Sequence, residues 1–171
     1  QAYLDNRITA LGAFTNLIGG KPYHVSRFRN KAFLALLSDL LSNEDYDIIQ
    51  LEGLAIAVYL RDIRKYTTAK IVLRAHNMEG QIWHRHLESE SNWLKRKYLE
   101  IQVSRLTDFE ISAVKEVDAL VSITEEDLSN FRKLVKSKVS ISIPCGVDIN
   151  QYSPCPEQNT TVDLAYLASF D

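Results

Sequence analysis

Hydrophobic positions along the chain follow two spacings that alternate from one end to the other. Short apolar runs, of the kind found in buried strands, occupy residues 47–51, 70–75, 118–123 and 138–143, and another begins at 162. Between these runs, apolar residues recur every three or four positions, as on one face of an amphipathic helix. The pattern therefore predicts strands and helices that follow each other in turn.

Helical spacing fills the segments between the strands. It is clearest after Asn30, where apolar side chains repeat at positions 32, 33, 36, 37, 40 and 41. The segment 54–66 is apolar nearly all round, which indicates a buried helix. Thr124 precedes three acidic residues and predicts a capped helix start. The other predicted helical segments are 3–18, which two glycines end, and 78–117, with a break near 89–92.

The alternation predicts an α/β fold, a Rossmann-like parallel sheet with helices on both faces. In such sheets, ligands bind beyond the carboxyl ends of the strands. Polar residues stand where three predicted strands end: Glu52 with Gly53, His76 with Asn77, and the step 122–124. We expect these residues to line one rim.

Composition narrows the class of protein. The 171 residues, 46% hydrophobic and 25% charged, are typical of a globular domain. A net charge of −2 argues against nucleic-acid binding. No apolar run reaches the ~18 residues of a membrane span, and no signal peptide is visible, so we expect a cytoplasmic protein. For Cys145 and Cys155 we expect two reduced thiols, with one disulfide as the alternative.

His76 is the first candidate for chemistry. It directly follows the buried run 70–75, and Asn77 after it predicts a helix cap. An imidazole at a sheet rim donates or accepts hydrogen bonds near neutral pH, which suits holding a polar ligand. The alternative is an ordinary packing or surface histidine.

Glu110 is the second candidate, because it interrupts an apolar stripe. Leu99, Val103, Leu106, Ala113 and Val117 repeat at helical spacing, and Glu110 falls among them. In one interpretation the helix turns this carboxylate to water. In the other it is buried against a cation, since a buried carboxylate needs a partner. Arg74 is then the first expected partner and His76 the second.

The other histidines and a basic segment have weaker interpretations. His84 and His86 lie two positions apart, which on a helix point to different sides, so we expect no metal site with His76. No glycine-rich phosphate-binding loop is visible. Residues 83–98 are locally basic and aromatic. A solvated helix face is the default interpretation, and contact with an acidic lipid or an anionic acceptor is the alternative.

Several segments together resemble the retaining GT-B glycosyltransferases of family 4, also called group 1. SISIPCGVDINQYSP, residues 140–154, resembles the IPNGVD element that closes the first domain in that family, with Cys145 in place of the usual Asn. RAHNMEGQIWHR (74–85) is similar to the strand-end HN.E element with its helix. VDALVSITEEDLSNF (117–131) and VDLAYLASFD (162–171) resemble later strands.

The resemblance implies a division of the chain. Residues 1–150 would form the acceptor-side Rossmann-like domain, with its first strand upstream of Gln1. Residues 151–161 would be the interdomain linker, and 162–171 the start of the donor-binding domain. The 171 residues alone are then expected to be inactive.

The resemblance also implies an activity of hexosyltransferase type. A sugar would pass, with retained configuration, from a nucleotide-sugar donor to a glycan or lipid-linked acceptor in bacterial surface polysaccharide synthesis. It implies no cofactor and no metal, and leaves room for peripheral contact with the inner membrane face. His76 matches the catalytic histidine, and Arg74 and Glu110 would give structural support. The expected substrate-binding residues are Glu52, Gly53, Asn77, Glu79, Ser122, Thr124 and Glu125.

Two other functions compete with this one. The first is a stand-alone Rossmann-like module that binds a small ligand or regulates a partner. The second is a metal-dependent hydrolase, which would require metal at His76, His84 and His86.

Overall fold

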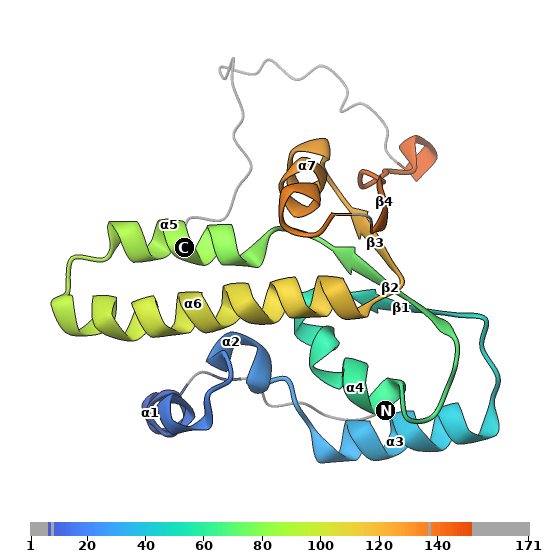
Figure 1. The fold of residues 1–171 in the computed structure, drawn as a ribbon, viewed down its shortest axis with the longest axis horizontal. Coiled ribbons are helices and arrows are strands. Elements are labelled where there is room, and N and C mark those ends of the chain that lie inside the picture. Colours follow the sequence, from blue (N-terminus) through green and yellow to red (C-terminus); the bar gives the residue numbers. More distant parts are fainter. Residues whose placement is uncertain (1–6, 8, 137, 152–171) are drawn as a thin grey trace.

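The strands form a single parallel sheet (Figure 1). The computed structural model describes residues 7, 9–136 and 138–151. The strands are β1 (Ile48–Glu52), β2 (Lys70–Ala75), β3 (Ala119–Ser122) and β4 (Val139–Ser142). All are paired in parallel in the order β1-β2-β3-β4. The predicted α/β class and parallel sheet are therefore confirmed.

Helices connect the strands. The α-helices are α1 (Ala10–Gly19), α2 (Tyr23–Ser26), α3 (Lys31–Asn43), α4 (Leu60–Ile63), α5 (Glu79–Ser89), α6 (Trp93–Glu116) and α7 (Glu125–Leu134). Two 3-10 helices are η1 (Leu54–Tyr59) and η2 (Ile149–Gln151). Helices α5 and α6 pack together as a hairpin that extends away from the sheet (Figure 1).

The structure confirms one helix boundary predicted from the sequence and contradicts one predicted helix. The break expected near 89–92 is confirmed: the side chain of Asn92 caps α6, accepting from the backbone N–H groups of Leu94 and Lys95. The single helix expected over 54–66 is wrong, since the chain there forms η1 and then α4. Within η1, the buried side chains of Leu54 and Ala57 stand three residues apart. A 3-10 helix, with three residues per turn, aligns its i and i+3 side chains on one face.

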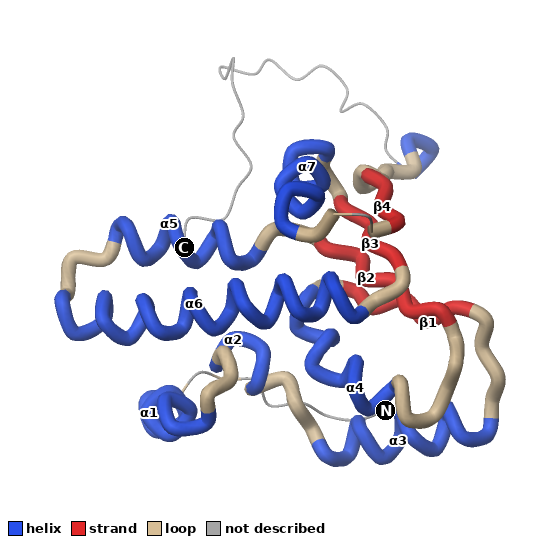
Figure 2. The backbone as a smooth tube through the Cα atoms, in the orientation of Figure 1, coloured by secondary structure: helices blue, strands red, loops and turns tan. Residues whose placement is uncertain are grey.

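The two faces of the sheet differ. Leu51, Leu73 and Leu120 are register partners across three strands, and they belong to the buried core that the helices complete. On the other face, Ile48 is 62% exposed and Val139 is 74% exposed. When strand order follows chain order, right-handed connections place every connecting helix on the same face. The described helices thus cover one face, where we expected both (Figure 2).

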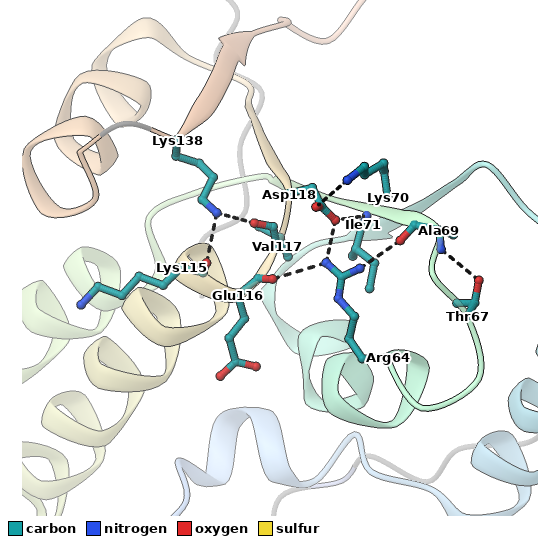
Figure 3. Close-up of polar contacts among 10 residues, drawn as sticks. All are labelled: Arg64, Thr67, Ala69, Lys70, Ile71, Lys115, Glu116, Val117, Asp118 and Lys138. Carbon is teal, nitrogen blue, oxygen red and sulfur yellow. Dashed lines mark hydrogen bonds and ion pairs between the residues drawn. The ribbon is translucent and has the colours of Figure 1, made fainter.

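A polar cluster joins the strands at the amino edge of the sheet (Figure 3). Arg64 donates to Oδ2 of Asp118 at 2.6 Å, and the backbone N–H of Ile71 donates to the same oxygen at 2.8 Å. Lys70 Nζ lies 3.6 Å from Oδ1 of Asp118. These contacts, the Arg64 pair first, lower the pKa of Asp118 to about 2. The cluster fixes α4, β2 and the start of β3 together.

Candidate functional site

Three of the predicted strand ends meet at the carboxyl edge of the sheet. Glu52 of β1 is the register partner of Arg74, and Ala75 of β2 is the partner of Ser122. His76 follows Ala75 directly. The sequence-based expectation of a common rim therefore agrees with the geometry of the strands.

The rim carries a cluster of three side chains, Glu52, Arg74 and His76, called here the rim cluster. His76 Nε2 lies 2.9 Å from Oε2 of Glu52, and Arg74 Nη1 lies 3.3 Å from the same oxygen. The hydrogen bond from His76 is the largest of several contacts that lower the pKa of Glu52. The His76 side chain is 46% exposed, so it is held on one side and open to solvent on the other.

Gly53 shapes the space beside His76. Its φ of 81° lies in the left-handed region, which side-chain-bearing residues adopt at a cost. Its N–H donates to the carbonyl of Arg74 at 2.9 Å, which ties the end of β1 to the end of β2. A Cβ at this position would lie 3.8 Å from Nδ1 of His76. Gly53 therefore turns the chain, and because it has no side chain, no Cβ contacts the imidazole at Nδ1 from this position.

The contact with Glu52 decides what His76 can offer. In the neutral ring, a proton on Nε2 is donated to Glu52, which leaves Nδ1 as an acceptor. In the protonated ring, both nitrogens donate, and Glu52 stabilises the positive charge. Either form presents one hydrogen-bonding nitrogen to a hydroxyl or other polar group at the rim.

Helix α5 begins beside the rim without a local cap. Its N-cap residue is Met78, which makes no side-chain hydrogen bond, so the prediction that Asn77 caps this helix is wrong. Glu110 of α6 caps the helix instead. Its two oxygens accept from the backbone N–H groups of Glu79, at 2.8 Å, and Gly80, at 3.0 Å. The first turn of α5 is thus anchored by a side chain of α6 that lies about thirty residues further along the chain.

Glu110 is buried, as one interpretation of the sequence expected, but its partner is different. The carboxyl is 2% exposed, and burial raises its pKa to about 7 against the two backbone hydrogen bonds, which favour the ionised form. The predicted pairing with Arg74 or His76 is wrong, because both of those side chains contact Glu52 instead. A Cβ on Gly80 would lie 3.0 Å from Oε2 of Glu110. Glycine at this position allows the close approach.

Glu79 contacts His24, a residue that the sequence did not identify as a candidate. Burial raises the pKa of Glu79, and its Oε2 lies 3.6 Å from Nε2 of His24. Burial, aided by Arg27, lowers the pKa of His24. His24 lies in α2, more than fifty residues before Glu79. Local spacing therefore gave no signal of this contact.

The residues at the end of β3 have structural partners. Ser122 is 0% exposed, and its hydroxyl donates to the carbonyl of Thr124 at 3.1 Å. Thr124 caps α7, accepting from the N–H of Asp127. The Ser122 side chain is therefore buried and does not face a ligand at the rim, contrary to the expectation. Ligand contacts by Thr124, Glu125 and Asn77, which are exposed, stay predictions.

Two further expectations concern cysteine and metal. Cys145 is an exposed free thiol whose Sγ lies 4.0 Å from Nη2 of Arg74. Cys155, the linker after 151 and the strand expected from 162 fall outside the described residues. Within the described part of the chain, no group of three His, Cys, Asp or Glu side chains is placed to hold a metal ion. No helix among these residues has the length and apolar character needed to cross a membrane.

The fold and the rim define a class of protein: a Rossmann-like α/β protein with a histidine–carboxylate pair open to solvent at the carboxyl edge of its sheet. Comparison of the sequence with protein-family models, curated proteins and solved structures finds no significant match.

Proposed function

We propose that the chain is the acceptor-side half of a retaining glycosyltransferase with two α/β domains. The observation that carries the proposal is the rim cluster. A histidine fixed by a carboxylate at 2.9 Å faces solvent at the sheet edge where ligands bind in open α/β folds. The order of the sequence elements that resemble family 4 supports the same assignment.

In this proposal His76 is a catalytic residue that touches the donor sugar. Its free nitrogen, Nδ1, holds a sugar hydroxyl while the bond to the nucleotide diphosphate breaks. Glu52 is a positioning residue that fixes the ring. Catalysis of this kind depends on orientation and on stabilising developing charge.

Asn77 and Glu79 are proposed to contact hydroxyls of the acceptor, together with Thr124 and Glu125. The first-turn amides of α5 already donate to Glu110, so they are not assigned to a phosphate. The nucleotide diphosphate is instead assigned to a donor-side domain that begins near 162. No metal or cofactor has a part in this proposal.

The proposed acceptor is a glycan or a lipid-linked glycan, and the proposed setting is bacterial surface polysaccharide synthesis at the cytoplasmic side of the membrane. Trp93 and Leu94, exposed at the start of α6, precede the basic run 95–97. Such a combination suits peripheral contact with an anionic membrane surface.

Donor screening of the full-length protein tests the proposal. Nucleotide sugars are incubated with the protein and an acceptor extract, and release of nucleotide diphosphate is measured. We expect turnover of at least one donor, strongly reduced in His76→Ala. His84→Ala is the matched control, because His84 is an exposed histidine of α5 whose ion pair within the described residues is local, with Glu88 at 3.4 Å. A full-length protein that binds a small ligand but turns over no donor would contradict the proposal and favour the stand-alone binding module.

A further inference from the structure

A cavity of about 220 Å³ lies between α1 and α2 on one side and α5 and α6 on the other. Figure 1 shows these helices gathered at the end of the molecule away from the strands. Apolar and aromatic side chains form most of the wall, namely Ala13, Tyr23, Trp83, Tyr98, Leu99 and Leu106, and His24, Arg27 and Gln102 complete it. This cavity is separate from the rim cluster.

Nearly all of the surface that faces the cavity is apolar, and the polar side chains of Gln102 and Tyr23 beside it already have partners. The amide oxygen of Gln102 accepts from the N–H of Tyr23 at 2.8 Å, and its nitrogen donates to Asn16 at 3.2 Å. The Tyr23 hydroxyl accepts from the N–H of Thr9 at 3.3 Å. A buried hydroxyl without a partner costs about 1–3 kcal/mol. A sugar ring would bring several hydroxyls, so the wall favours an apolar group.

Contacts through His24 connect the cavity wall to the start of α5. Trp83 lies one turn after Glu79 on this helix, and its ring centroid is 5.1 Å from that of His24. His24 in turn contacts Glu79 at 3.6 Å. A ligand with its apolar part against Trp83 would therefore place its polar end toward Glu79.

We propose that this cavity binds the apolar group of an amphiphilic acceptor, an alkyl chain or a single aromatic ring. The acceptor's hydroxyl-bearing part then extends toward Glu79 and the rim cluster. The cavity is smaller than the ~300 Å³ at which drug-sized pockets begin, so it holds a short chain or one ring system. The assignment of this ligand as an acceptor rests on the proposed function, whereas its binding does not.

Ligand binding is measured first, in an experiment that requires no catalytic activity. The chain contains two tryptophans, so Trp93→Phe leaves Trp83 as its only tryptophan reporter. Glucose, phenyl β-glucoside and alkyl β-glucosides of increasing length are titrated below their critical micelle concentrations. We expect Trp83 fluorescence to respond to the glucosides, with affinity rising by up to about fourfold per CH₂ until the cavity is full. Equal responses to glucose and to the alkyl glucosides would overturn the proposal.

Variants of the cavity wall locate the site. Ala13→Phe, in the same background, fills the cavity and should weaken binding at least tenfold. Thr15→Phe makes the same addition on an exposed position of α1 and should leave binding unchanged. Leu99→Ala enlarges the cavity and should shift the affinity plateau to longer chains. Binding that Ala13→Phe does not weaken would place the ligand elsewhere and overturn the proposal.

Activity of the full-length protein then separates this inference from the proposed function. If both hold, His76→Ala abolishes transfer but keeps glucoside binding, and Ala13→Phe raises the KM for an alkyl acceptor with little change in kcat. Glucoside binding without any transfer would keep the cavity inference and reject the glycosyltransferase. Transfer with a KM unaffected by Ala13→Phe would keep the glycosyltransferase and reject the cavity inference.

Discussion

Charged side chains cluster at both edges of the sheet, but the groups that they contact differ between the two edges. At the amino edge, Asp118 accepts from a backbone N–H, and Arg64 donates to the carbonyl of Ala69 at 2.9 Å. At the carboxyl edge, Glu52 is contacted by the side chains of Arg74 and His76. Contacts to the main chain lock the fold, whereas contacts among side chains orient groups that can still meet a ligand. The amino edge therefore contributes to stability, whereas the carboxyl edge carries the chemistry in the proposed function.

The largest expected effect is on activity at the carboxyl edge. His76→Ala should lower the transfer rate of the full-length protein by about 100-fold or more, the range for a positioned hydrogen-bonding group. Because His76 is about half exposed and its side-chain hydrogen bond is to the exposed Glu52, its loss should leave thermal unfolding nearly unchanged. Steady-state kinetics and calorimetry measure the two effects. A fall in stability that matches the loss of activity would show that His76 has a structural role, as Asp118 has at the amino edge.

Glu110, beneath the carboxyl edge, should make stability depend on pH. Its pKa is raised from 4.5 to about 7, so the folded state binds a proton more tightly than the unfolded state. The free energy of unfolding therefore falls as pH rises from about 4.5 to about 7, and the lost contribution is of order 3 kcal/mol.

Glu110→Gln isolates that contribution, because the amide stays neutral. The free energy of unfolding of the variant, relative to that of the unmodified protein, should rise by about 3 kcal/mol between pH 4 and pH 8. Denaturant unfolding measures this difference. A stability difference that is constant across this interval would refute the assignment of the raised pKa.

At the amino edge, Asp118→Asn should lower stability by about 1–3 kcal/mol, because charged hydrogen bonds to Arg64 and Ile71 are lost or weakened. The pKa of Asp118 is lowered from 3.8 to about 2, so its contribution is present above pH 4 and is lost as pH falls through 2. Denaturant unfolding at pH 7 gives the size of the effect. The KM and kcat of the full-length protein should not change, and a selective loss of kcat would contradict a purely structural role.

The smallest expected effect is that of Glu52→Gln. The amide still accepts from His76 but no longer stabilises its positive charge, so transfer should fall about tenfold with stability changed by less than about 1 kcal/mol. Glu52→Asp serves as the conservative control, since it keeps the charge and moves it back by one methylene. Equal transfer by all three proteins would show that Glu52 does not position His76.

Local patterns predicted the strands and the rim, because apolar runs mark buried strands and parallel strands share a carboxyl edge. They did not predict the partners of Glu110 or His24. Those contacts join residues that are thirty or more positions apart, and they depend on how α5 packs against α6 and α2. The 3-10 helix η1 had one signal in the sequence, the three-residue spacing of Leu54 and Ala57. The apolar character of the whole segment concealed it.

The anchoring of α5 by Glu110 has a consequence for how this site would diverge between relatives. The direction in which Glu79 faces is set by a side chain of α6 and by the missing Cβ of Gly80, rather than by the loop that precedes α5. Substitutions along α6 would thus change the orientation of Glu79 without altering any residue of the rim cluster.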